Sequence, residues 1–156
     1  MTTFIGDYTC KPDSKGRVLV PATFMKQMAQ GAQERFVIKK DIFENCLVLY
    51  PMDEWESQGK LIREKTNPYN REHSHFLRQF FKGTAEVLLD SNNRILIPKR
   101  LLDEIKAEKE LVLAGQFGKI EIWPRKAYEE LGSREDEFTS LAEKILGGKI
   151  YETDEK

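Results

Sequence analysis

The sequence is poor in the residues that disulfide scaffolds and metal centres require. Its 156 residues include two cysteines, Cys10 and Cys46, and two histidines. Two cysteines make no disulfide framework, and their spacing matches no metal-binding motif. Both fall in strand-like patterns, so we expect buried, reduced thiols. His73 and His75 stand two apart, which places them on different faces of a helix, so we expect no metal site, no cofactor and no catalytic residue.

Long apolar runs are missing as well. No stretch approaches the roughly 20 apolar residues of a membrane-spanning helix, and the first residues lack the basic and apolar regions of a signal peptide. We therefore expect a cytoplasmic protein with no membrane partner. A large positive charge, which is usual in nucleic-acid-binding domains, is also absent, since the net charge is −1. The charge is uneven, however: residues 11–26 carry four cations against one acid, and residues 125–156 carry six cations against nine acids.

What the chain does contain is an internal repeat. Residues 4–28 recur without a gap as residues 81–105. The tightest part reads Asp-Ser-Lys-Gly-Arg-Val-Leu-Val-Pro first and Asp-Ser-Asn-Asn-Arg-Ile-Leu-Ile-Pro second. Its apolar positions are typical of a core, whereas its Asp and Arg, four residues apart, are polar and belong to a turn. Two copies of one charged turn indicate a surface that contacts a partner at two points.

Each copy predicts the same order of elements, β-β-α-β-β. An alternating stretch leads into the polar turn and a β-branched triplet follows it, which is typical of a hairpin. Gly16 and its counterpart Asn93 both tolerate the positive φ that closes such a turn. Pro21 and Pro98 suit the first turn of a helix. Two further strands complete each copy.

Neither copy is large enough to bury a good core alone. We therefore predict an α+β fold in which two tandem half-domains pack as a pseudo-dimer around a shared, barrel-like sheet. The predicted parts are a first repeat at 4–55, a bridging helical segment at 56–80, a second repeat at 81–128, and a C-terminal helix and tail at 129–156. We expect breaks at Asn67-Pro68 and near Gly132-Ser133, Trp55 as a packing anchor, and a frayed tail at 149–156.

The two Asp-x-x-x-Arg turns admit a structural and a functional interpretation. In the structural one, the Asp caps the turn and the Arg forms a solvated ion pair worth under about 1 kcal/mol. In the functional one, the Asp holds the Arg toward a nucleic-acid groove, where its planar fork matches guanine or phosphate. Lys15 would add a phosphate contact, and its counterpart Asn92 is neutral. The predicted DNA contacts are Asp13, Lys15, Gly16, Arg17, Asp90, Asn93 and Arg94.

These motifs carry a family resemblance. The opening Met-x-x-Phe-x-Gly-x-Tyr and the segment Asp13-Ser-Lys-Gly-Arg17-Val-Leu-Val-Pro21 resemble the first signature of MraZ. MraZ is a family of bacterial transcriptional regulators with two tandem SpoVT/AbrB-type DNA-binding motifs. Phe81-Lys-Gly83, with Asp90 and Arg94 through Pro98, resembles the second signature. The likeness covers residues 1 to 145.

The resemblance implies a pseudo-twofold double-split β-α-β barrel of the swapped-hairpin, AbrB-like kind. It also implies that both Asp-x-x-x-Arg motifs form the surface that contacts double-stranded DNA. A ring-like homo-oligomer would bind direct repeats in the promoter of the division and cell-wall gene cluster, in the cytoplasm and associated with the nucleoid. No small-molecule substrate is implied.

Two other classes of function are weaker. An enzyme is not expected, because no nucleophile or base recurs beside the Asp and Arg in both copies. The alternative is a protein-interaction module, such as an antitoxin-like member of the same superfamily. That function needs a long, disordered extension studded with apolar residues. Here the tail past Gly148 has eight residues, with Ile150 and Tyr151 as its apolar content.

Overall fold

The computed structural model describes residues 2–28 and 34–147. The chain divides into two compact units, Met1–Arg125 and Lys126–Lys156, and each is described by itself. The predicted frayed tail at 149–156 lies outside the described residues.

The first unit contains both repeats in the predicted order. The first repeat comprises β1 (Asp7–Cys10), β2 (Arg17–Leu19), α1 (Ala22–Gln27), β3 (Arg35–Lys40) and β4 (Leu47–Pro51). Two connecting helices follow, α2 (Met52–Lys65) and α3 (Arg71–Phe81). The second repeat comprises β5 (Ala85–Leu88), β6 (Arg94–Leu96), α4 (Lys99–Glu104), β7 (Leu111–Gln116) and β8 (Lys119–Pro124). Pro21 and Pro98 immediately precede α1 and α4, and the break at Asn67-Pro68 separates α2 from α3, as predicted.

The strands reveal a pseudo-twofold relation between the repeats. Six of them form one antiparallel sheet in the order β1-β7-β8-β4-β3-β5, while β2 pairs with β6 in a separate ladder. Each strand has a counterpart in the other repeat: β1 corresponds to β5, β3 to β7 and β4 to β8. Replacing every strand by its counterpart gives the same order read from the opposite edge of the sheet. The register agrees: Cys10 lies opposite Leu111, and its counterpart Val87 lies opposite Phe36. Each half therefore lends its first strand to the other half, which confirms the swapped-hairpin architecture.

Two details of the prediction are wrong. The strands flanking each polar turn do not form a local hairpin, because β1 pairs with β7 and β2 with β6. The sheet is not a closed barrel either. β1 and β5 form its edges, each with a single strand neighbour in the described part of the chain. Since β2 and β6 pair with each other rather than with those edges, no continuous ring of strands results.

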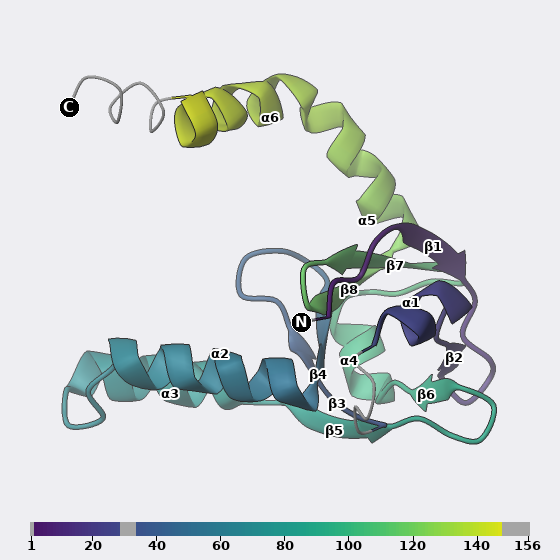
Figure 1. The fold of residues 1–156 in the computed structure, drawn as a ribbon, viewed down its shortest axis with the longest axis horizontal. Coiled ribbons are helices and arrows are strands. Elements are labelled where there is room, and N and C mark those ends of the chain that lie inside the picture. The colour runs from purple at the N-terminus through teal and green to yellow at the C-terminus, as the bar shows by residue number, and fades with distance from the viewer. Residues whose placement is uncertain (1, 29–33, 148–156) are drawn as a thin grey trace. The chain divides into compact units, whose positions relative to one another are not determined.

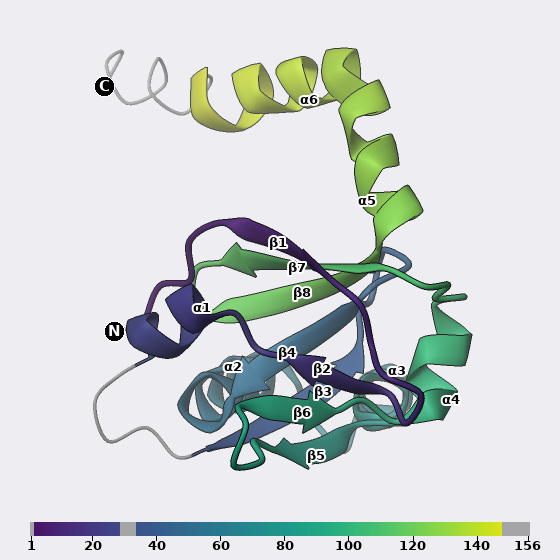
Figure 2. The ribbon, with the colours of Figure 1, turned by 90° about the vertical axis from the view of Figure 1, so that its right-hand side faces the viewer.

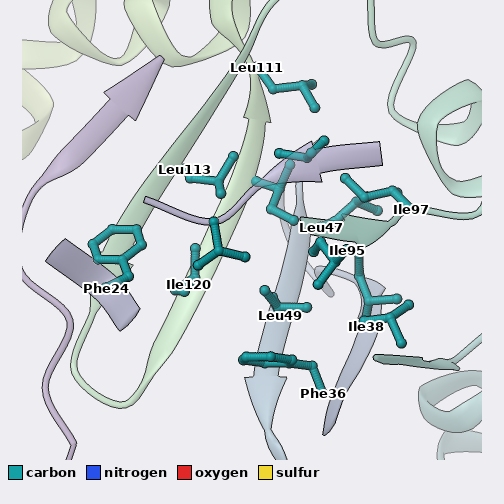
Figure 3. Close-up of a cluster of buried hydrophobic side chains, with 14 of the residues drawn as sticks. Phe24, Phe36, Ile38, Leu47, Leu49, Ile95, Ile97, Leu111, Leu113 and Ile120 are labelled. Carbon is teal, nitrogen blue, oxygen red and sulfur yellow. The ribbon is translucent and has the colours of Figure 1, made fainter. Parts of the chain in front are cut away.

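Both repeats contribute to one core, in which side chains of the sheet pack with those of α1, α4, β2 and β6. Figure 3 shows Phe24, Leu49, Ile95 and Ile120 gathered in it. Each fully buried Leu, Ile or Phe contributes about 1.5–3 kcal/mol through removal from water. The largest fully buried side chains are Phe24, Phe36, Ile38, Leu47, Leu49, Ile95, Ile97, Leu101, Ile105, Leu111, Leu113 and Ile120. Because they come from both halves, the shared core predicted for the repeats is confirmed.

The cysteine prediction is confirmed for Cys46, which is a free, fully buried thiol. Cys10 is free as well but only partly buried, at the margin of the core. Burial raises the pKa of Cys10 to about 11, so its thiol stays protonated near neutral pH.

On the other face of the sheet α2 contacts β3 and β4, and α3 runs beside α2 (Figure 1). The ring of Trp55 lies 5.4 Å from that of Tyr50 and 6.3 Å from that of Phe80, so its predicted role as a packing anchor is confirmed. Lys39 is only 5% exposed on this face, and its ammonium lies 3.9 Å from the ring centroid of Phe80. Burial lowers the pKa of Lys39, and the aromatic face stabilises its charge.

The second unit is helical with the predicted break. α5 (Arg125–Glu130) leads through a tight turn, Leu131–Arg134, to α6 (Glu135–Ala142) and a final turn, Glu143–Gly147. Gly132 and Ser133 lie within that tight turn, where the regular helix is interrupted. Within residues 2–28 and 34–147, no helix combines the length and the apolar character needed to cross a bilayer.

Candidate nucleic-acid interface

The first turn, residues 13–17, is organised by the carboxylate of Asp13. Its Oδ1 accepts the backbone N–H groups of Lys15 and Arg17, each at 2.9 Å, and its Oδ2 accepts Nε of Arg17 at 2.6 Å. The backbone N–H of Gly16 donates to the carbonyl of Asp13 at 3.0 Å. The backbone N–H of Arg17, reinforced by its guanidinium, lowers the pKa of Asp13 to about 2. The ionised carboxylate therefore closes the turn and holds the arginine at the same time.

The second turn, residues 90–94, repeats these contacts. Oδ1 of Asp90 accepts the backbone N–H groups of Asn92 and Arg94 at 2.8 and 3.0 Å, and Oδ2 accepts Nε of Arg94 at 2.9 Å. The hydrogen bond from the backbone of Arg94 is the main cause that lowers the pKa of Asp90. Two turns 77 residues apart thus have the same hydrogen-bonding scheme.

The fourth position of each turn requires a positive φ. Gly16 has φ 89° and Asn93 has φ 60°, which confirms the prediction made from their residue types. The two positions differ in the space around them. A Cβ on Gly16 would lie 3.0 Å from the carbonyl oxygen of Ile97, so the first turn also needs the small size of glycine.

The two turns are joined by the ladder of β2 and β6, here called the central ladder (Figure 2). Its middle residues, Val18 and Ile95, lie opposite each other and are fully buried. Successive side chains of a strand point to opposite faces, so the arginines and leucines beside them share the outer face. Arg17 lies opposite Leu96, and Arg94 lies opposite Leu19. The fold therefore places both arginines on one narrow two-stranded surface.

The arginine side chains are held but not enclosed. Those of Arg17 and Arg94 are 34% and 30% exposed. Among the described residues, the side chain of Arg17 makes a single hydrogen bond through Nε, which leaves its two Nη groups for an incoming acceptor. Nη1 of Arg94 lies 4.0 Å from Oδ2 of Asp13, a contact between the two turns that their sequences did not indicate. The ladder thus brings all seven predicted DNA-contact residues into two linked turns.

Sequence reasoning missed two cations beside the first turn. Lys99 and Lys109, both from the second repeat, line the same hollow as Lys11 and Lys15. Their distance along the chain concealed this proximity. The signal that could have revealed them is their difference from the first repeat, in which Ala22 and Glu34 occupy the corresponding positions.

Ligand-type side chains also gather away from these turns. Asp41, Cys46 and Glu121 bring one ligand atom each within 4.8 Å of one another. The carboxylate of Asp41 already accepts the backbone N–H groups of Phe43 and Glu44, and burial raises the pKa of the Cys46 thiol. We assign no metal to this cluster.

The fold and the turns define an α+β protein of two tandem repeats that exchange strands and present paired Asp-x-x-x-Arg turns. A family model described as "MraZ protein, putative antitoxin-like" matches residues 3–75 and 80–147. The chain belongs to the MraZ family.

Several relatives align over nearly their full length. A protein of Christiangramia forsetii is 40% identical over 97% of this chain and 98% of its own. A protein of Bacteroides thetaiotaomicron is 36% identical over the whole of both chains. One of Clostridium tetani is 34% identical over 91% of this chain and 96% of its own. Each bears the name Transcriptional regulator MraZ.

Proposed function

We propose that this protein is a transcriptional regulator that binds double-stranded DNA in a sequence-specific manner through its two Asp-x-x-x-Arg turns. The observation that carries the proposal is the central ladder, which holds Arg17 and Arg94 on one outer face with the same carboxylate bracing. A two-stranded β element is narrow enough to enter the major groove. The names of the relatives support the regulatory role.

Each residue of the turns has a part in this contact. Asp13 and Asp90 orient the turns and hold the arginines, which donate through their Nη groups to guanine O6 and N7 or to phosphate. Gly16 and Asn93 supply the backbone conformation, and Lys15 contacts phosphate. Because the bracing is present before DNA arrives, little side-chain entropy is lost on binding.

The proposed target and assembly come from the family resemblance, and the net charge supports the assembly. We propose that a ring-like homo-oligomer, in the cytoplasm and on the nucleoid, binds direct repeats in the promoter of the division and cell-wall gene cluster. A subunit of net charge −1 should bind DNA weakly alone, whereas several linked subunits gain affinity through effective concentration. Large exposed apolar side chains support self-association, among them Phe43 at 88% and Phe117 at 81%.

Substituting Arg17 tests the proposal directly. Arg17→Ala should abolish binding to a duplex from that promoter in gel-shift and fluorescence-anisotropy assays. Arg17→Lys keeps the charge but not the planar fork, so binding should fall and discrimination between sequences should weaken. Arg78→Ala is the matched control, because Arg78 is an exposed arginine on α3. Circular dichroism and light scattering check that fold and oligomer are retained. Undiminished binding by a folded Arg17→Ala variant would refute the proposal.

The same variant addresses the alternative function. In an antitoxin-like interaction module, binding to a protein partner would persist when Arg17 is replaced, and the promoter duplex would not bind even the wild-type protein with sequence preference. A preference for the promoter duplex that disappears with Arg17 favours the regulator.

A further inference from the structure

A hollow of about 420 Å³ lies beside the first turn, and lysines from both repeats line it. Lys11 and Lys15 come from the first repeat, whereas Lys99 and Lys109 come from the second. All four side chains are exposed. The chain exchange between the halves therefore gathers cations that stand almost a hundred residues apart in the sequence.

The acids around this hollow compensate only part of that charge. Asp13, Asp103 and Glu108 also line it. Asp13 is already engaged by Nε of Arg17 at 2.6 Å. Two acids thus remain against four lysines, so a site for a negative ligand results.

The pseudo-twofold relation provides an internal comparison. The positions that correspond to Lys11, Lys15, Lys99 and Lys109 are Leu88, Asn92, Ala22 and Glu34, none of which is cationic. Asp103, which also lines the hollow, corresponds to Lys26, so the second turn gains one cation at that position. The two turns have the same hydrogen-bonding scheme but different electrostatic surroundings. The lysines are therefore not required by the turn itself, because the second turn forms without them.

We propose that this hollow binds backbone phosphates of DNA held at the first turn, and that the second turn makes no equivalent contact. This inference rests on the proposed function. Lysine is a compact charge with three rotatable donors, which suits a phosphate oxygen better than the patterned edge of a base. Phosphate contacts fix the position and orientation of a protein on the duplex. The lysines around the first turn alone would make it the stronger DNA contact and give the bound subunit a direction along the DNA.

The salt dependence of binding measures these contacts. Each lysine–phosphate contact contributes about 0.9 to the slope of log K against log salt, which is about fivefold in affinity at physiological salt. Lys99→Ala/Lys109→Ala should therefore weaken binding on the order of 30-fold per engaged turn and lower the slope by about 2. Lys99→Ala recreates the residue that the first repeat carries in the same place, so the fold should tolerate it. Lys60→Ala/Lys65→Ala removes two exposed lysines from α2 and is the matched control.

A gain-of-contact variant gives independent support. Ala22→Lys/Asn92→Lys places two lysines around the second turn at exposed positions. It should steepen the salt slope by about 2 and tighten binding. Ethylation-interference mapping should then show phosphate contacts on both flanks of a repeat, instead of the one-sided pattern expected for the wild type.

The outcomes separate this inference from the proposed function. If Arg17→Ala abolishes binding while Lys99→Ala/Lys109→Ala behaves like the α2 control, the phosphate hollow is refuted and the DNA-binding function stands. If Arg17→Ala binds as the wild type does, the proposed function fails and the inference fails with it. Inorganic phosphate at the ionic strength of a chloride control tests a free-phosphate site. Phosphate that binds the wild type but not the lysine variant, and yet displaces no DNA, would overturn the assignment to DNA backbone.

Discussion

Exchanging the residues at the fourth position of the two turns should change the stability of the protein unequally in the two repeats. Asn at position 93 is tolerated at φ 60°, so residue type alone would suggest that Gly16→Asn is mild. The structure predicts otherwise. At φ 89° the new Cβ would lie 3.0 Å from the carbonyl oxygen of Ile97. That oxygen belongs to backbone, which cannot rotate away as a flexible side chain does.

Two contributions make up the loss of folding stability expected for Gly16→Asn. An ordinary L-residue in the left-handed region costs about 1–2 kcal/mol, and Asn, one of the few residues that visit this region, costs less. Relief of the contact with Ile97 must also lengthen the hydrogen bond from Ile97 N–H to the carbonyl of Gly16, now 3.0 Å, which costs about 1 kcal/mol more. We therefore expect Gly16→Asn to lower the free energy of unfolding by about 1–2 kcal/mol. Asn93→Gly should stay within about 1 kcal/mol of the wild type.

Urea unfolding followed by circular dichroism measures both variants, and promoter binding measures the consequence for Arg17. Gly59→Ala serves as the control, because this substitution should raise the free energy of unfolding instead of lowering it. Gly59 lies within α2, and no atom lies within 4 Å of the Cβ that it would gain. Alanine there should stabilise the protein by about 1 kcal/mol. If Gly16→Asn and Asn93→Gly unfold at the same urea concentration, the contact with Ile97 has no energetic consequence and the reasoning is wrong.

Two further predictions concern pH and the DNA target. The folded pKa of Asp13, about 2, lies below its ordinary value, so its stabilising contribution is complete above about pH 4 and is lost as the pH falls toward 2. Asp13→Asn should flatten the acid limb of stability against pH in urea titrations, and an unchanged limb would contradict the bracing. Affinity should rise steeply with the number of promoter repeats in gel shifts, because linked subunits bind at high effective concentration. A single repeat that binds as tightly as three or four would show that avidity has no part.

The repeat, the turns and the helix boundaries were predictable because each depends on local chemistry. Gly16 and Asn93 indicated a positive φ through their residue types, and Pro21 and Pro98 indicated helix starts. Strand partners were not predictable from residue patterns. β2 and β6 have three residues each, and alternating apolar residues show which face is buried but not which strand lies alongside. A local hairpin and an exchanged one satisfy the same pattern, so the swapped arrangement entered only through the family resemblance.

The candidate site divides in the same way. The Asp and Arg of each turn are four residues apart, so their hydrogen bonds follow from local geometry. The contact of Arg94 with Asp13 and the position of Lys99 beside Lys15 depend on chain exchange, which joins distant parts of the sequence. For Lys39, the sequence predicts the position in a strand but not the burial. That burial depends on how α3 packs its Phe80 against the lysine.

The asymmetry between the turns bears on the kind of DNA site that such a fold can read. A DNA-binding protein with true twofold symmetry matches a palindromic site, because each half of the protein contacts an equivalent half-site. Here the backbone has a pseudo-twofold axis through the central ladder, yet Lys15, Lys99 and Lys109 surround only the first turn. The phosphate contacts proposed at the first turn alone would favour one orientation of the subunit on the duplex. Successive subunits of a ring in the same orientation would require their sites to repeat head to tail. In the proposed ring these contacts would favour direct repeats, and placing lysines around the second turn should weaken the preference for them over inverted repeats.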